Sequence, residues 1–340
     1  MCATERFFVT TPTVAICIVS FDEAVNLIGV LDSLSRSAHE QFAVFICETG
    51  GAAGFERSSR ALDDAQFLKG QRASGATRDF RLQPGGQRVV LLDAGGNLGY
   101  AGGNNAAIRA ALADGGFDAF WVLNADTFPE PEALQALVHR QADGSYGMVG
   151  SRIVFKASGL IQMWGGFDWN HWLARGTRAF GYLKPKDTPA DVGDVERRME
   201  VVCGASMYVT KEYVDDVGLM DESLFLFCED SDWCLRRGRH RLGYAHDSVV
   251  HHIHGATTGS STDKKRISPL SLYLTARNRV RLARKEFGLL WPAPALLIFA
   301  DLLRFLIKGT PAAYRTVLSG WWAGVRGEGG APPMLAGRDG

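Results

Sequence analysis

Two features that often identify a protein's class are missing from this chain of 340 residues. It has no excess of charge, because lysine plus arginine and aspartate plus glutamate both number 37. A net charge of zero gives no overall attraction to nucleic acid, so electrostatic work must be local. The six cysteines form no CxxC pair. This spacing is unlike a zinc ribbon or a disulfide framework, and we expect small buried side chains in a reducing compartment.

Long uncharged apolar runs are also scarce. The first twenty residues contain an acid and no cleavage-site pattern, so we expect no secretory signal. The most apolar stretch, residues 287–307, is interrupted by two prolines, by Asp301 and by Arg304. A membrane-spanning helix needs about 20 mostly apolar residues. This stretch therefore predicts a helix on a membrane surface or in the core, and no span.

The chain does contain an alternation of strand and helix patterns. Residues 13–21 form a continuous β-branched and aromatic run, residues 22–37 have apolar residues at helical spacing, and residues 42–51 form the next strand. Such alternation predicts a parallel sheet with helical crossovers. Residues 52–87 lack strong periodicity and predict an insertion with a short helix near 59–69. Further strands are expected at 88–96, 117–126, 146–155, 199–210 and 241–255, and helices at 104–115, 131–143, 211–220, 231–240 and 269–287.

One polar turn follows an expected strand. The sequence LNADT, residues 123–127, places Asp126 where a strand ends, and open α/β sheets bind ligands at the carboxyl ends of their strands. A carboxylate with oxygen neighbours suits Mg²⁺ or Mn²⁺, which also bind phosphate oxygens. The alternative is that Asp126 only caps the helix that begins near Pro131.

A glycine-rich stretch, GGNLGYAGGNNAAI at residues 95–108, opens a helix after a strand. Such a loop lets backbone N–H groups approach a phosphate or a sugar ring closely. The stretch matches neither the G-x-G-x-x-G pattern nor a Walker A loop. The alternative is a loop whose glycines serve only its turns.

Three carboxylates lie close together in LFCEDSDWCLRRGRH, residues 226–240. Asp232 lies near the start of an expected helix, where the helix dipole favours an acid without any further role. Burial of Glu229 and Asp230 beside aromatic residues costs free energy unless cations or hydroxyl donors face them. A carboxylate that takes a proton from a substrate hydroxyl is the functional interpretation.

Two further segments carry clustered histidines or bases. Four histidines fall within HDSVVHHIHG, and on a strand His252 and His254 share a face that His251 does not. Histidine is a common metal ligand, but a closed zinc site would need more ligands nearby, and at least two of the four fit ordinary surface histidines. The basic stretch 264–285 predicts a solvated helix, or contacts with a diphosphate and with anionic lipid headgroups.

Taken in order, these motifs resemble those of a known family. The series is CIVSF, CETGG, NLGYAGGNN, LNADT, VCGASMYV, the acid-rich segment, VVHHIHG and YLTARN. It is similar to that of the inverting glycosyltransferases of family 2, and most similar to the bacterial rhamnosyltransferase-type enzymes of cell-surface polysaccharides. The resemblance covers residues 13 to about 285. It implies an α/β fold of the GT-A type, Rossmann-like, with a mixed central sheet flanked by helices and a helical C-terminal extension.

We expect two parts in the chain. Residues 1–262 would form the GT-A catalytic domain, with a nucleotide-sugar half at about 13–150 and an acceptor half at about 151–262. Residues 263–340 would form a basic and apolar helical extension.

The resemblance also implies roles for the matching residues. Asp230 would be the general base, with Glu229 or Asp232 orienting it. Asp126, in an Asn-x-Asp variant of the family's Asp-x-Asp site, would hold Mg²⁺ or Mn²⁺ together with His251. The residues expected to bind the donor are Ser20, Glu48, Asn97, Gly99, Asn104, Asn124, Gly204 and Arg277.

The implied activity is an inverting, metal-dependent hexosyl transfer. The donor would be a nucleotide-diphospho-sugar, dTDP-rhamnose or a UDP-sugar, and the acceptor a saccharide or lipid-linked saccharide of polysaccharide biosynthesis. The implied location is the cytoplasm, with peripheral contact at the cytoplasmic face of the inner membrane. One departure concerns Glu48, because the family usually has aspartate at that position.

Two other functions remain open at this point. A catalytically inactive sugar-nucleotide-binding module would share the fold, but loss of Asp126 or Asp230 would have favoured it, and both residues are present. A sugar nucleotidyltransferase would need a glycine-rich basic loop after the first strand, where this chain has SFDEAVN.

Overall fold

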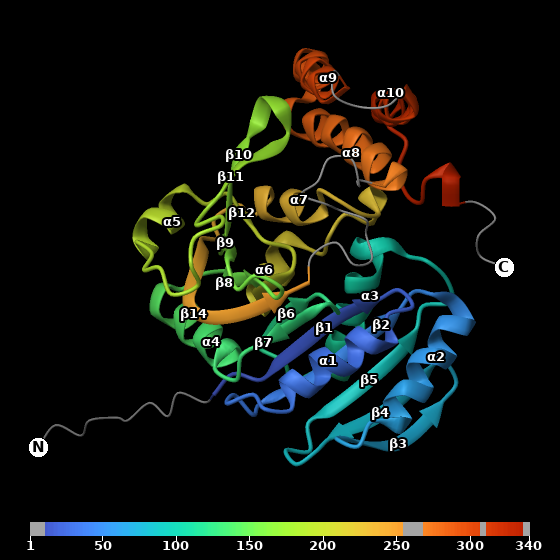
Figure 1. The fold of residues 1–340 in the computed structure, drawn as a ribbon, viewed down its shortest axis with the longest axis vertical. Coiled ribbons are helices and arrows are strands. Elements are labelled where there is room, and N and C mark those ends of the chain that lie inside the picture. The colour runs from blue at the N-terminus through green and yellow to red at the C-terminus, as the bar shows by residue number, and fades with distance from the viewer. Residues whose placement is uncertain (1–10, 254–267, 307–310, 336–340) are drawn as a thin grey trace, which may run out of the picture.

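The structure is a computed structural model that describes residues 11–253, 268–306 and 311–335. Within these ranges, one sheet of 11 strands forms the centre of the molecule (Figure 1). Its strands are β1 (Val14–Ser20), β2 (Phe42–Glu48), β3 (Leu68–Ser74), β4 (Thr77–Leu82), β5 (Arg88–Asp93), β6 (Ala119–Leu123), β7 (Thr127–Pro129), β8 (Met148–Phe155), β9 (Ile161–Trp164), β13 (Ser206–Thr210) and β14 (Leu242–His252). A smaller sheet contains β10 (Gly166–Asn170), β11 (Arg175–Ala179) and β12 (Val201–Val202).

The central sheet is mixed, with the order β3-β4-β5-β2-β1-β6-β13-β8-β14-β7, and β9 pairs with β8. The strands β5, β2, β1 and β6 run parallel, as the alternating pattern predicted. β13 then pairs antiparallel with both β6 and β8. The runs VAICIVS and FAVFICE of β1 and β2 contain no exposed residue, because helices cover both faces of this part of the sheet.

The described helices are α1 (Ala24–Leu34), α2 (Gly51–Asp64), α3 (Gly99–Asp114), α4 (Ala133–Gly144), α5 (Val192–Arg198), α6 (Lys211–Val217), α7 (Glu229–Leu235), α8 (Pro269–Phe287), α9 (Pro292–Leu306) and α10 (Pro311–Arg326). Short 3-10 helices are η1 (His171–Leu173), η2 (Glu222–Leu224), η4 (Gly288–Leu290) and η5 (Pro333–Leu335).

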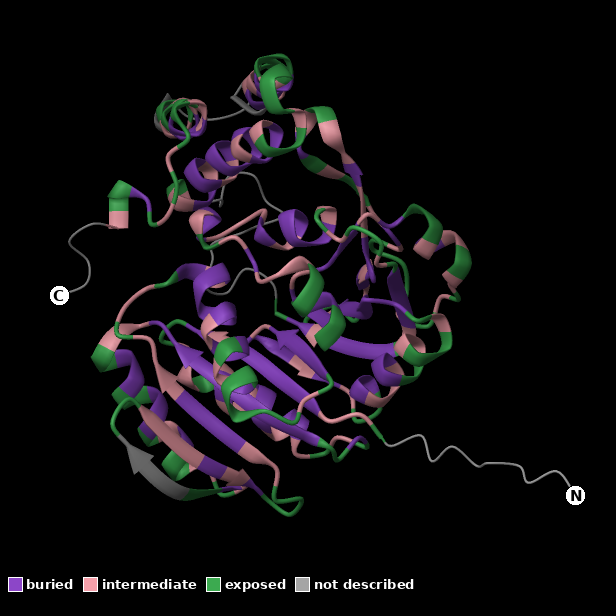
Figure 2. Ribbon diagram, turned by 180° about the vertical axis from the view of Figure 1, so that it is seen from behind, coloured by how far each residue is buried: buried purple, intermediate pink, exposed green. Residues whose placement is uncertain are grey.

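Two hydrophobic clusters lie on the two faces of the sheet. Ala15 and Cys17 of β1 belong to one cluster, and Val14 and Ile16 belong to the other, as strand alternation requires. α1, α2 and α4 contribute to the second cluster, and α3, α6, α7 and α8 contribute to the first. Figure 2 shows the resulting band of buried residues along the central strands. The five cysteines in the described ranges are free thiols, and four of them are buried, as expected.

The segment 52–87 differs from the expected insertion. α2 occupies its first part, and β3 and β4 extend the edge of the central sheet by antiparallel pairing next to β5. The helix has few apolar residues, because its buried side includes Gly54, Ser58 and Ser59 besides Phe55 and Leu62. β4 has the sequence TRDFRL, with two apolar residues among six, so it resembles a polar loop.

The C-terminal helices pack on one another above the sheet (Figure 1). α8 has the bounds expected for the basic helix, and η4 and α9 lie within the apolar stretch that follows it, up to residue 306. Among the described helices, none is long and apolar enough to cross a membrane. The expected domain boundary at 262–263 lies outside the described residues.

The β10–β11 hairpin is tied to these helices. Arg279 of α8 donates two hydrogen bonds to the Leu173 carbonyl, at 2.9 and 2.7 Å, and forms an ion pair of 2.7 Å with Asp301 of α9. The ring of His171 lies between Glu200 and Glu286. Hydrogen bonding with Glu200 and the charge of Glu286 outweigh burial, so the pKa of His171 is raised.

Candidate active site

The carboxyl ends of the parallel strands meet at one edge of the sheet. Ser20, the last residue of β1, lies opposite Glu48, the last residue of β2, and Glu48 lies opposite Asp93 of β5. Asn124 follows β6 directly. Three of the residues predicted to bind the donor, Ser20, Glu48 and Asn124, therefore share this edge.

Glu48 is fully buried and acts as a hydrogen-bonding centre. Its Oε2 accepts from the hydroxyls of Ser20 at 2.6 Å and Ser58 at 2.7 Å. Its Oε1 accepts from the backbone N–H groups of Asp22 at 2.9 Å and Gly50 at 2.8 Å. The carboxylate thus fixes the end of β1 to the start of α2. Direct contact of Ser20 and Glu48 with a nucleotide stays a prediction.

The start of α3 lies against the loop that precedes the acid cluster. Gly99 has φ +68°, and a Cβ there would lie 2.4 Å from the Phe225 carbonyl oxygen, so only glycine fits. The side chain of Asn97 accepts from the Gly99 N–H at 3.0 Å. Asn104 is fully buried, and its Nδ2 donates to the Tyr100 carbonyl at 3.0 Å. Its Oδ1 has no hydrogen-bond partner in the structure.

The helix that carries the acid cluster begins two residues earlier than the sequence predicted. α7 starts at Glu229, which places Glu229 and Asp230 in its first turn. Phe225, Phe227 and Cys228, just before it, have φ of +66°, +70° and +69°. Such left-handed conformations are unfavourable for residues with a Cβ, and they stop the helix from extending toward the N-terminus. The periodicity of apolar residues could not predict where α7 starts, because the left-handed residues of the preceding loop set that position.

Burial sets the electrostatics of this acid pair. Burial, and then the charge of Asp230, raise the pKa of Glu229 well above its ordinary value. Burial also raises the pKa of Asp230, while hydrogen bonds from Ser231 and from the Gly204 N–H oppose that rise. Within the part of the chain that the structure describes, the buried Oε2 atom of Glu229 has no hydrogen-bond partner. The pair can therefore hold a proton, and one buried carboxylate oxygen is left unsatisfied.

Backbone contacts hold Asp230 in place. Its Oδ1 accepts from the Ser231 N–H at 2.6 Å and from the Ser231 hydroxyl at 3.1 Å. A Cβ at Gly204 would lie 2.9 Å from Asp230 Oδ2, so glycine at this position gives the carboxylate room. Tyr100 donates its hydroxyl to the Gly204 carbonyl at 2.6 Å. Sequence analysis did not assign a role to Tyr100, although it lies within the motif NLGYAGGNN.

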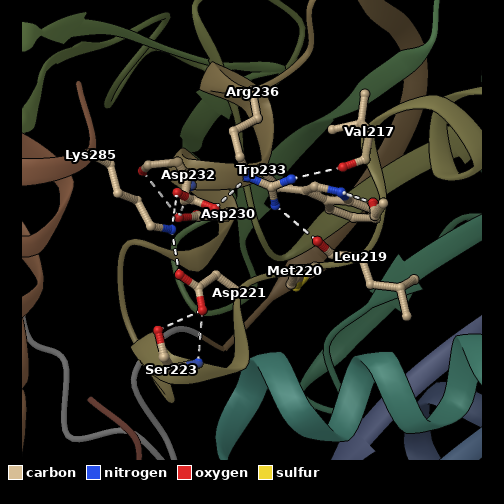
Figure 3. Close-up of polar contacts among 12 residues, drawn as sticks. Val217, Leu219, Met220, Asp221, Ser223, Asp230, Asp232, Trp233, Arg236 and Lys285 are labelled. Atoms are coloured by element: carbon tan, nitrogen blue, oxygen red, sulfur yellow. Dashed lines mark hydrogen bonds and ion pairs between the residues drawn. The ribbon is translucent and has the colours of Figure 1, made fainter. Parts of the chain in front are cut away.

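Asp232 is a neighbour of the pair but faces two cations. Its Oδ2 accepts from Arg236 Nε at 2.7 Å, and its Oδ1 accepts from Lys285 Nζ at 2.7 Å (Figure 3). Lys285 also contacts Asp221, and hydrogen bonds from Lys285 and Ser223 outweigh burial and lower the pKa of Asp221 to about 2. Asp232 thus joins α7 to α8. An orienting role toward Asp230 stays a prediction.

The motif YLTARN of α8 holds the strained loop. Asn278 is fully buried, and its Nδ2 lies 2.8, 3.0 and 2.8 Å from the carbonyl oxygens of Leu224, Leu226 and Phe227. Arg277 is 1% exposed and donates to Leu224 O at 3.0 Å and Gly330 O at 2.8 Å. Its contact with a diphosphate stays a prediction. The sequence did not predict a role for Asn278, because this residue acts through contacts with backbone carbonyls that are distant from it in the sequence.

The second part of the candidate site surrounds Asp126. Its Oδ1 lies 3.2 Å from Nε2 of His252, whereas Nε2 of His251 lies 2.9 Å from Glu130. Neighbouring residues of β14 point to opposite faces, so the structure brings Asp126 together with His252 and not with His251. His254 lies outside the described residues.

The chemistry of this second part fits a divalent cation that also binds substrate. Nowhere in the described ranges do three or more His, Cys, Asp or Glu side chains form a metal-binding group. Mg²⁺, however, is usually held by one or two carboxylates and completed by phosphate and water. Asp126 is 7% exposed, and the buried Asn124 Oδ1 beside it in the chain has no hydrogen-bond partner. These oxygens fit the cation.

Replacement of Asn278 by alanine tests the loop clamp. The carbonyls of the loop would lose their buried donor, so we expect Asn278→Ala to lower the free energy of unfolding by about 1–3 kcal/mol. Urea denaturation of the wild type and the variant measures this difference. Asn26→Ala, which removes one partly buried hydrogen bond to Glu23, is the control and should cost less. Equal losses in the two variants would mean that the clamp does not stabilise the fold.

Comparison with known proteins extends these observations. The chain is 26% identical over 218 residues to the low-salt glycan biosynthesis hexosyltransferase Agl10 from Haloferax volcanii, a match that covers 59% of this chain and 62% of that protein. The chain therefore matches less than two thirds of this relative's length. Among solved structures, it is similar to mannosyltransferase PcManGT from Pyrobaculum calidifontis in complex with GDP-Man and Mn²⁺. That similarity has a TM-score of 0.51 at 14% identity, over 96% of this chain and 79% of the other.

The structural similarity confirms the predicted GT-A-like fold with its mixed sheet and C-terminal helices. Residues 12–268 match the family described as "Glycosyltransferase like family 2". The matched range contains the acid pair, Asp126 and the glycine-rich start of α3, so the chain belongs to the glycosyltransferase-like family 2.

Proposed function

We propose that the protein is an inverting glycosyltransferase in which Asp230 is the general base. It would move a sugar from a nucleotide-diphospho-sugar, dTDP-rhamnose or a UDP-sugar, to a hydroxyl of a saccharide or lipid-linked saccharide. The observation that carries this proposal is the placement of Glu229 and Asp230. They are two adjacent acids in the first turn of α7, with pKa values raised by burial and with one carboxylate oxygen left unsatisfied.

The base is supported by how Asp230 is held. Ser231 fixes Oδ1, so the carboxylate has one orientation, and Oδ2 lies on the side of Gly204. A raised pKa brings the carboxyl closer to neutral pH, where a base accepts a proton most efficiently. Asp230 would take the proton of the acceptor hydroxyl as that oxygen attacks the anomeric carbon from the face opposite the leaving group. A single displacement of this kind inverts the configuration.

Two buried amide oxygens support binding of a nucleotide sugar, because the hydroxyl and N–H groups of such a substrate can donate hydrogen bonds to them. Asn104 Oδ1 and Asn124 Oδ1 have no hydrogen-bond partner in the structure. An unsatisfied buried acceptor costs about 1–3 kcal/mol, which a ligand recovers when it donates a hydrogen bond there. Both residues were predicted to bind the donor, and sugar and ribose hydroxyls supply such donors.

The cation is proposed at Asp126, with Asn124 as a second oxygen ligand and His252 next to the carboxylate. When bound, Mg²⁺ or Mn²⁺ would neutralise charge on the leaving diphosphate. The Mn²⁺ reported with the mannosyltransferase of similar fold supports this choice of metal. The residues of this chain would position the diphosphate relative to Asp230.

The variant Asp230→Asn tests the base. We expect turnover to fall about 10²–10⁴-fold, because general-base catalysis contributes on this scale. Affinity for the donor should stay near that of the wild type, since the side chain keeps its size. The assay is nucleoside diphosphate release from UDP-, dTDP- and GDP-sugars with a panel of saccharide acceptors, with NMR of the product for its anomeric configuration.

The matched control for this experiment is Asp247→Asn, an exposed residue of β14. It should keep both turnover and donor affinity. Wild-type turnover in Asp230→Asn would disprove the base assignment. If the wild-type chain binds no nucleotide sugar at all, the donor proposal is wrong.

Metal removal tests the second part of the site. We expect chelation with EDTA to weaken donor binding and added Mn²⁺ to restore it. The variants Asp126→Asn and His252→Ala should each need at least about tenfold more Mn²⁺ for half-maximal restoration, as losses at or around a metal ligand usually do. His251→Ala, the matched control on the opposite face of β14, should restore as the wild type does. If His251→Ala needed more Mn²⁺ than His252→Ala for half-maximal restoration, the Asp126–His251 pair would be favoured as the metal site.

A further inference from the structure

The most exposed large apolar side chains near the C-terminus lie on one set of elements. Leu289 and Leu290 of η4 are 98% and 73% exposed, Leu296 and Leu297 of α9 are 64% and 46% exposed, and Trp322 of α10 is 51% exposed. η4 and α10 both contact α9, so these side chains belong to one end of the molecule. We call these five residues the apolar crown. Figure 2 shows exposed residues on the outer turns of α9.

The crown cannot be explained by the packing of α9 within the molecule. Ala295, Ile298 and Leu302 form the inner side of this helix and are 2%, 0% and 7% exposed. The outer side, with Leu296 and Leu297, is apolar as well. A surface helix of a globular protein normally has a polar outer face, and a helix that is apolar all round is normally covered. An outer surface of this kind is typical of an interaction site.

The charges of this region are mostly positive. Residues 288–327 contain four bases, Arg304, Lys308, Arg315 and Arg326, and a single acid, Asp301. Asp301 faces inward, because it forms an ion pair with Arg279 and its side chain is 18% exposed. Arg315 is exposed on α10, while Arg326 forms an ion pair with Glu328. The described surface thus combines leucines and a tryptophan with the exposed Arg315, which is complementary to an anionic, apolar phase.

We propose that η4, α9 and α10 form a docking surface for a lipid bilayer that contains anionic headgroups. The crown would enter the boundary between headgroups and acyl chains, and Arg315 would remain among the headgroups. Tyrosine and tryptophan favour that boundary, since each has an apolar ring with a polar edge. α9 would lie along the bilayer, consistent with the finding that no described helix is able to span one.

α8 connects this surface to the acid pair. It packs against α9 and α10, and its Arg277 and Asn278 hold the loop that ends at Glu229. Figure 1 shows α8 between the two outer helices and α7. Docking would therefore set the orientation of the acid pair relative to the bilayer. This last step rests on the proposed function, since it concerns a lipid-linked acceptor, whereas docking itself does not.

Vesicle flotation of the full chain tests the proposal. The probes are vesicles of phosphatidylcholine alone and of phosphatidylcholine mixed with phosphatidylglycerol, each at low and high salt. We expect binding to the anionic vesicles at least about tenfold tighter than to the neutral ones, weakened by salt. The double variant Leu289→Glu/Leu290→Glu should abolish flotation. Arg315→Glu should lower affinity for the anionic vesicles at least about fivefold and leave weak binding to neutral vesicles unchanged.

The matched control is Val25→Glu/Leu112→Glu, which replaces two exposed apolar residues of α1 and α3. It should float as the wild type does. Nucleotide-sugar binding without lipid should be retained in all variants, which separates loss of docking from loss of the donor site or of the fold. Absence of wild-type flotation, or flotation of the leucine variant at wild-type levels, would overturn the proposal. So would a wild-type dimer in light scattering that the leucine variant converts to a monomer, since a second copy would then cover the crown.

Discussion

The rest of the candidate site depends on one constraint: two adjacent carboxylates, the buried Glu229 and the half-buried Asp230, lie at the start of a helix. Removing carboxylates from water costs free energy, and here burial raises the pKa values of both. The position is maintained by three left-handed residues before α7, and Asn278 holds the carbonyls of that loop. Without the clamp the loop could relax, and the acids would be free to turn toward water.

The elements around the pair follow from this arrangement. Gly99 lets α3 approach the strained loop, and Gly204 lets the sheet approach Asp230. Tyr100 connects α3 to the Gly204 carbonyl. Asp232, two residues after Asp230, points to Arg236 and Lys285 and so fixes α7 to its surroundings. One short acidic segment therefore contains residues of two kinds, the pair proposed for catalysis and a structural anchor.

Much of this could be predicted from the sequence, because strand ends and motif order are local properties. Asp126 and Asp230 are placed by the strand and the helix that carry them, and the apolar runs of β1 and β2 indicate a sheet buried on both faces. The contacts of Asn278 and Tyr100 could not be predicted, since they join segments distant in sequence. The partner of Asp126 depends on strand register, and a shift of one residue exchanges His251 for His252. The edge strands β3 and β4 were missed because they contain few apolar or β-branched residues.

The pH dependence of kcat/KM tests the central claim, that the buried acid pair supplies the base. A base must be deprotonated, so activity falls as the pH falls through its pKa. An isolated aspartate would give a limb near pH 3.9, and the raised pKa of Asp230 predicts a limb at higher pH. Burial raises the pKa of Asp230, so Glu229→Gln, which keeps the size of the side chain, should retain a limb above the ordinary aspartate value, whereas Asp230→Asn should lose the limb together with most of the turnover. A limb that persists in Asp230→Asn, or one at the ordinary aspartate value in the wild type, would contradict the account.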